Sequence, residues 1–71
     1  MKEYLIIIES GTHNYSAYAP DLPGCVATGK TLEEVTRRMQ EAIEFHIQGL
    51  LEEHEPVPEP TSIAERVQVS I

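Results

Sequence analysis

The sequence predicts a small α+β domain in which three strands precede one long helix and a fourth strand follows it. Three observations lead to this order: an isoleucine-rich opening segment, an amphipathic repeat from Leu32 to about Glu53, and an apolar–polar alternation over the last residues. A chain of 71 residues has room for one domain only, residues 1–71. So short a chain buries little surface on folding, which favours self-association.

The first expected strand runs from Glu3 to Glu9 and is apolar on both faces. Such a strand is normally covered on both sides, so we expect it in the middle of a sheet. The composition of Ser10–Asn14 is typical of a turn, and Tyr15–Ala19 has the composition of a second strand. The two strands should form a hairpin.

Pro20–Gly24 must interrupt the sheet, because proline lacks the amide donor and glycine permits a positive φ. Cys25–Thr28 is short but suits a third strand. The motif Gly24–Thr31 matches the P-loop pattern G-x-x-x-x-G-K-T. No strand precedes its first glycine and its interior is itself strand-like, so we interpret the match as chance.

The expected helix begins after Thr31, which forms a capping box with Glu34. A helix ending near Glu53 would be roughly 33 Å long, whereas a seven-residue strand spans about 23 Å. The helix should therefore extend beyond the end of the sheet. The apolar stripe of this helix comprises Leu32, Val35, Met39, Ala42, Ile43, His46, Ile47 and Leu50.

Pro56, Pro58 and Pro60 exclude helix between His54 and Ser62. The alternation that ends at Ile71 then predicts a fourth strand, parallel to the first through a right-handed crossover. The predicted fold is β-β-β-α-β, a four-stranded mixed sheet of order 3-2-1-4 with the helix on one face. The opposite face would keep apolar residues from the first strand, which predicts a homodimer or higher homo-oligomer.

The charge balance excludes several classes of partner. Twelve acidic against five basic side chains give a net charge of −7, which disfavours nucleic acid, including direct DNA binding, and anionic membranes. A basic protein partner is favoured instead. The acidic helix face is one expected contact region, with Glu33, Glu34, Glu41 and Glu44.

We expect no catalytic, cofactor or metal site. Cys25, the only cysteine, has no histidine at a recognisable spacing, and His46 has no second ligand one turn away, since positions 42 and 50 are alanine and leucine. A lone cysteine suits a reducing compartment, and the opening apolar run is too short for a signal peptide or membrane span, so we expect a cytoplasmic protein.

Phe45 stands on the polar side of the expected helix, beside Gly49. An aromatic ring in that position indicates local packing against the proline-rich segment or a contact with a second subunit. The residues expected at an oligomer interface are Phe45, His46, Leu50 and Leu51.

Four stretches resemble the HicB family of antitoxin-like proteins: Tyr18–Cys25, Thr28–Glu34, Glu41–Ile43 and Val57–Pro60. The P-D-L-P-G-C run followed by G-K-T-L-E-E is fairly specific, and it accounts for the chance P-loop match. The resemblance implies a fold similar to part of ribonuclease H without its catalytic metal site. It also implies binding and masking of a basic HicA-type toxin that cleaves mRNA.

Longer relatives carry a DNA-binding segment after this domain, and we expect none here. The loop residues expected to contact the partner are Tyr18, Pro20, Asp21, Leu22, Pro23, Gly24 and Cys25. An alternative from another class stays open: an orphan ligand-binding protein or small enzyme that uses Asp21 and Cys25 at a dimer junction.

Overall fold

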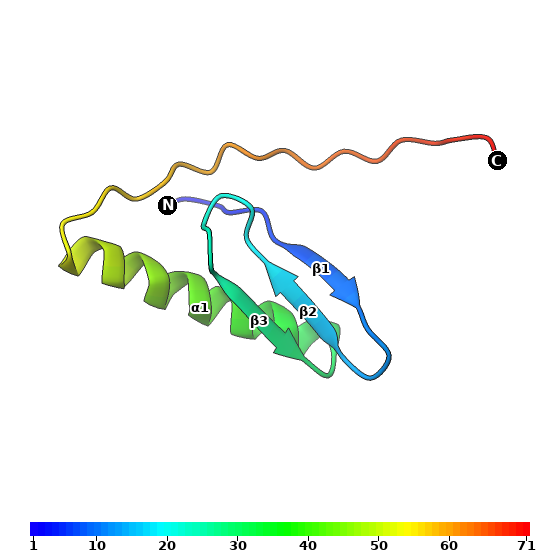
Figure 1. The fold of residues 1–71 in the computed structure, drawn as a ribbon, viewed down its shortest axis with the longest axis horizontal. Helices are drawn as coiled ribbons and strands as arrows, with labels where there is room; N and C mark the ends of the chain where they lie inside the picture. The colour runs from blue at the N-terminus through cyan, green and yellow to red at the C-terminus, as the bar shows by residue number, and fades with distance from the viewer.

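Three short strands and one long helix make up the regular structure of the chain (Figure 1). A computed structural model describes all 71 residues. The elements are β1 (Ile7–Ser10), β2 (Tyr15–Tyr18), β3 (Val26–Gly29) and α1 (Leu32–Glu52). The hairpin, the short third strand and the helix are therefore as predicted, and α1 extends past the sheet at its C-terminal end (Figure 1).

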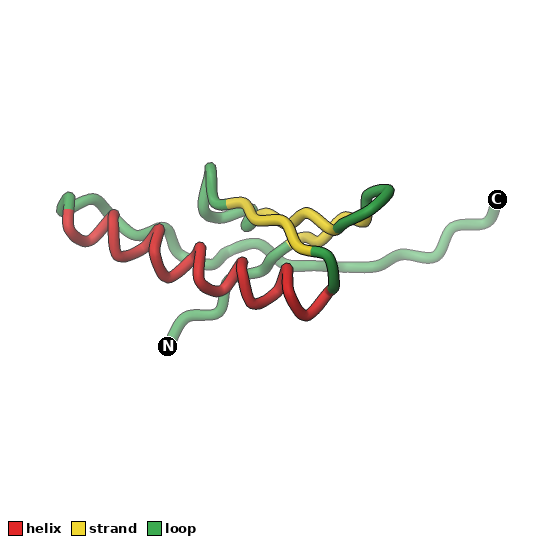
Figure 2. Tube along the Cα trace, turned by 90° about the horizontal axis from the view of Figure 1, so that it is seen from below, coloured by secondary structure: helices red, strands yellow, loops and turns green.

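The sheet is antiparallel, with the order β1-β2-β3. Ile8 pairs with Ala17, which pairs with Ala27, and these three side chains belong to the face that meets the helix. Figure 2 shows α1 crossing below that single face. The backbone of the helix lies close to β3 and β2 and not to β1, although the Ile8 side chain of β1 still packs against the core.

The predicted capping box is present at the start of α1. The Thr31 hydroxyl accepts a hydrogen bond from the Glu34 amide at 3.0 Å, and the Glu34 carboxylate accepts one from the Lys30 amide at 2.7 Å. The Glu34 amide is one of the free amides of the first helical turn. Lys30 precedes the N-cap Thr31, so the Glu34 carboxylate returns one residue earlier than in the standard capping box. The Lys30 hydrogen bond holds the pKa of Glu34 below its usual value.

The core is small and lies between β2, β3 and the first half of α1. Leu22, Val35 and Met39 are fully buried, and Ala17, Ala19 and Cys25 surround them. Gly29 lets β3 approach the helix closely, since a Cβ there would lie 2.6 Å from the Val35 amide nitrogen. The close approach explains why a glycine stands at position 29, the second glycine of the chance P-loop match.

The predicted fourth strand is wrong for this structure. Residues 55–71 form neither helix nor strand, so β1 is an edge strand rather than a central one. Strand β1 also begins at Ile7 instead of Glu3, because its partner β2 ends at Tyr18, just before the Pro20 turn.

The chain after the helix runs extended across the N-terminal segment. The Tyr4 hydroxyl donates to the Pro58 carbonyl at 2.6 Å, and Lys2 pairs with Glu59 at 2.8 Å. Asp21 then accepts hydrogen bonds from residues 61 and 62. Beyond this point residues 63–71, called the tail below, lead away from the sheet (Figure 1).

Candidate partner-binding surface

The loop between β2 and β3 is closed by its own backbone. The Ala19 amide donates to the Cys25 carbonyl at 3.2 Å, and the Cys25 amide donates to the Leu22 carbonyl at 3.1 Å. Gly24 has a φ of 84°, a conformation that glycine adopts without strain. The two prolines and this glycine thus shape a tight, defined loop.

The loop residues expected to contact a partner divide into two groups. Leu22 and Cys25 point into the core, and Asp21 accepts hydrogen bonds from Thr61 and Ser62, just before the tail. These three side chains hold the loop in place. Those left exposed are Tyr18, Pro20, Pro23 and Gly24.

A groove lies between this loop and the second half of α1. We call it the loop–helix groove, and its volume is about 470 Å³. Its lining is Gly24, Cys25, Val26, Ala42, Phe45, His46, Gly49, Leu50, Glu53 and Glu55. The overhanging helix end and the loop thereby create one shared surface from sequence regions that are more than fifteen residues apart.

Exposed apolar side chains stand beside this groove. Phe45 is 79% exposed and Val26 is 66% exposed, although both are large and hydrophobic. Val26 also lies on β3, the second free edge of the sheet. Apolar side chains left uncovered at a sheet edge are typical of a protein-binding site.

The electrostatics of the groove are unfavourable for the isolated chain. Glu53 and Glu55 line it at the C-terminal end of α1, and the last helical turn holds no basic residue. The C-terminus of a helix carries partial negative charge, so carboxylates there repel it and cations stabilise it. A cationic partner would relieve this repulsion.

The acidic helix face is partly neutralised within the chain. Arg37 lies 3.6 Å from Glu41, and Arg38 lies 3.9 Å from Glu34. Glu33 and Glu44 have no cation within the 4.0 Å limit of an ion pair. The four glutamates predicted as contacts therefore differ in how freely they can engage a partner.

The residues expected at an oligomer interface do not share one surface. Phe45, His46 and Leu50 line the loop–helix groove, whereas Leu51 lines a different groove beside the N-terminal segment, residues 1–6. The sequence reasoning missed Val26, Glu53 and Glu55. The acidic run at the end of the helix, with no basic residue near it, is the signal that could have revealed Glu53 and Glu55.

The chemistry of Cys25 argues against a nucleophile. Its side chain is buried, and burial raises the pKa of the thiol, whereas a reactive cysteine needs a lowered one. His46 lines the same groove, yet no hydrogen bond joins it to the thiol. No group of three or more histidine, cysteine, aspartate or glutamate side chains is arranged to hold a metal ion.

A comparison with known protein families identifies the family to which the chain belongs. The profile described as HicB-like antitoxin of bacterial toxin-antitoxin system matches residues 4–70. The chain belongs to the HicB-like antitoxin family. No helix of this antitoxin-family domain is both long and apolar enough to cross a bilayer.

Two relatives illustrate the spread of this HicB-like family. An uncharacterised 14.9 kDa protein in the rep-hol intergenic region of Haemophilus phage HP1 is 41% identical over 64 residues, which cover 90% of this chain and 48% of the phage protein. A UPF0150 protein of Synechocystis is 35% identical over 69 residues, covering 96% of this chain and 87% of that protein. The chain thus spans about half of the phage protein and most of the cyanobacterial one.

A solved structure described as the HicA3 and HicB3 toxin-antitoxin complex contains a similar chain. The TM-score is 0.73 at 32% identity, and the match covers 84% of this chain and 70% of the other. The HicB-like fold is thereby found in a complex of a toxin with an antitoxin.

Proposed function

We propose that this HicB-like chain is an antitoxin that binds and masks a small basic toxin of the HicA type, which cleaves mRNA. The observation that carries the proposal is the match to a chain of a HicA3–HicB3 complex at 32% identity. The net charge of −7 supports it, because an RNA-cleaving toxin must present basic side chains to phosphate.

The loop–helix groove is the surface that we assign to the toxin. It combines the exposed Phe45 and Val26, which offer apolar contact, with Glu53 and Glu55, which lack cations of their own. Aromatic side chains that become buried at the centre of a protein interface, inside a polar rim, often contribute most of its binding energy. The exposed loop residues Tyr18, Pro20 and Pro23 would extend the contact.

The antitoxin would act by covering the RNA-binding surface of the toxin and would catalyse no reaction. Carboxylates at the helix end would take the place of RNA phosphates on the basic toxin surface, and the bound domain would exclude RNA sterically. Formation of such a complex removes the repulsion between Glu53, Glu55 and the helix terminus. The enzyme alternative built on Asp21 and Cys25 has no supporting geometry, since Asp21 is engaged by Ser62 and the thiol is buried.

The test is growth rescue with the short basic protein encoded next to this chain's gene. Induction of that neighbour alone should arrest growth, and co-expression of this chain should restore growth and yield a complex that survives purification. The absence of a short basic neighbour, or a toxic neighbour that the chain does not relieve, would contradict the proposal.

Two charge reversals locate the contact. Glu53→Lys with Glu55→Lys should weaken toxin binding at least about tenfold, since it places cations in the loop–helix groove. Lysine at the end of a helix favours the helix dipole, so a loss of binding would not reflect unfolding.

The charge control is Glu33→Lys with Glu41→Lys, which changes the net charge equally at two exposed positions of α1 that line neither groove. An equal loss in both variants would mean that net charge alone acts, and a loss only in the control would move the contact to the outer face. Retained binding in both would remove the electrostatic part of the proposal.

A further inference from the structure

The tail has the pattern of a strand but no partner within the chain. Ile63, Val67, Val69 and Ile71 are between 71% and 117% exposed. The last three alternate with Arg66, Gln68 and Ser70, as in a strand with one face buried. Figures 1 and 2 both show this segment projecting from the domain.

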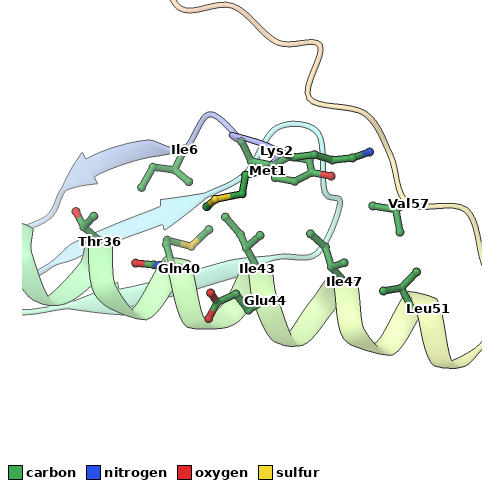
Figure 3. A pocket seen from close by; sticks show the side chains of 12 residues that line it. Met1, Lys2, Ile6, Thr36, Gln40, Ile43, Glu44, Ile47, Leu51 and Val57 are labelled. Atoms are coloured by element: carbon green, nitrogen blue, oxygen red, sulfur yellow. The ribbon is translucent and has the colours of Figure 1, made fainter.

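The free edge of β1 can provide the backbone hydrogen-bond partners that the tail lacks. Strand β1 is the terminal strand of the sheet, so its outer side carries unpaired backbone groups. A groove of about 680 Å³ opens between α1 and residues 1–6, the segment that leads into β1. Figure 3 shows the Ile6, Ile43, Ile47 and Leu51 side chains lining it.

The tail of the same chain does not fill this groove. The hydrogen bond from Tyr4 to Pro58, the ion pair from Lys2 to Glu59, and the Asp21–Ser62 hydrogen bonds fix its starting direction. From residue 55 to residue 71 the backbone makes no turn. The tail therefore leaves the domain straight and reaches beyond its own β1 (Figure 1).

We propose that the tail adds as a strand to the free β1 edge of a second copy of this chain, and that the exchange is reciprocal. Each copy holds one donor strand and one acceptor edge, so two copies satisfy each other in a closed two-fold dimer. Val67, Val69 and Ile71 face the groove of the second copy, while Gln68 and Ser70 stay on the outer face of the sheet.

Charge favours this occupant. The tail carries one acidic side chain, Glu65, and one basic side chain, Arg66, so its side chains add no net charge, whereas the side chains of the whole chain sum to −7. A neutral strand approaches a second acidic copy without the repulsion that the helix face or the loop–helix groove would meet.

The buried area is sufficient for a stable dimer. Each aliphatic side chain removes about 100 Å² of apolar surface from water when it is covered. Two tails with the grooves that receive them then bury on the order of 1,500 Å², which is the size of a standard interface. The exchange is independent of the proposed toxin binding, so failure of the growth rescue would leave it standing.

Light scattering on the full chain tests the exchange. At micromolar concentration the mass should be twice the chain mass of 8.0 kDa. Val69→Asp should raise the dimer dissociation constant at least tenfold, whereas Ser70→Asp, which adds the same charge to the opposite face, should leave the dimer intact. A monomeric wild type, or equal effects of the two variants, would overturn the proposal.

A cross-link identifies the acceptor. Chains with Cys25→Ser and Glu9→Cys are mixed with chains carrying Cys25→Ser and Gln68→Cys, and the mixture is oxidised. A disulfide between the two kinds of chain supports pairing of the tail with β1. Disulfides only between two Gln68→Cys chains would show tail-to-tail pairing, and a monomer whose tail amides resist hydrogen exchange would show closure within one copy. Either result rejects the exchange.

Discussion

The carboxylate of Asp21 accepts two hydrogen bonds from Ser62, one from the backbone amide at 3.1 Å and one from the hydroxyl at 2.9 Å. Thr61 adds a third at 3.2 Å. A loop residue that the sequence presents as a candidate contact for a partner thus binds Ser62 of the same chain, 41 residues further on and just before the tail. This anchor sets the direction in which residues 63–71 leave the domain.

The anchor should depend on pH. Hydrogen bonds from Ser62 hold the pKa of Asp21 below its ordinary value of 3.8. A group with a lowered native pKa contributes stability that is complete above the unfolded value and is lost as the pH falls through the native one. We therefore expect the Ser62 amide resonance to titrate with a midpoint below 3.8.

Asp21→Asn is the matched variant for that titration. Its Ser62 amide should not titrate, and its exchange with solvent should be faster at pH 7. Glu65→Gln, at an exposed position with no ion pair, should behave as wild type. A Ser62 amide that is unaffected by Asp21→Asn would show that the anchor contributes nothing in solution.

Gly29 should be intolerant of even the smallest side chain. Gly29→Ala would place a Cβ 2.6 Å from the Val35 amide nitrogen and 2.9 Å from its Cα, which forces β3 away from α1. We expect a loss of about 1–3 kcal/mol of unfolding free energy in urea titrations.

Gly49 provides the control for Gly29. A Cβ at Gly49 meets nothing within 4 Å, so Gly49→Ala should gain up to about 1 kcal/mol from helix propensity. Equal effects of the two substitutions would disprove the close approach of β3 to α1.

The capping box should account for a measurable part of the stability of α1. Thr31→Ala removes the hydroxyl that accepts from the Glu34 amide and should cost about 1 kcal/mol of unfolding free energy. Thr36→Ala lies within the exposed helix and should be neutral or slightly stabilising. A neutral Thr31→Ala would place the start of the helix elsewhere.

Cys25 should be unreactive in the folded chain. Its burial raises the pKa of the thiol, so alkylation by iodoacetamide at neutral pH should be far slower than that of glutathione. Labelling should become complete in denaturant. Rapid labelling of the folded chain would revive the alternative of a chemical role for Asp21 and Cys25.

The elements predicted most closely are those specified by local chemistry. The Thr31–Glu34 box and the three- to four-residue apolar repeat define α1 almost to the residue, because caps and helix faces depend on neighbours within four positions. Pro20, Pro23 and Gly24 likewise define the loop. Local signals also locate β2 and β3.

The errors concern long-range pairing. A doubly apolar first strand was expected at the sheet centre, yet β1 is an edge because the segment that should cover it is held by Tyr4, Lys2 and Asp21 on another course. Only parts of the candidate surface, the β2–β3 loop and Phe45, His46 and Leu50 of the helix, were predicted from the sequence. Glu53, Glu55 and Val26 come together only because the overhanging helix end passes the β2–β3 loop.

The sequence by itself determined the order of three strands and a helix, the acidic character and the family relationship, since each rests on composition or on contacts within a few residues. Tertiary structure alone decided that Asp21 binds Thr61 and Ser62, that Phe45 and Leu51 line different grooves, and that β1 keeps an open edge. Those outcomes depend on hydrogen bonds and packing contacts between residues that are far apart in the sequence. The alternating pattern of residues 63–71 indicates a strand, but it does not specify the strand with which this segment pairs.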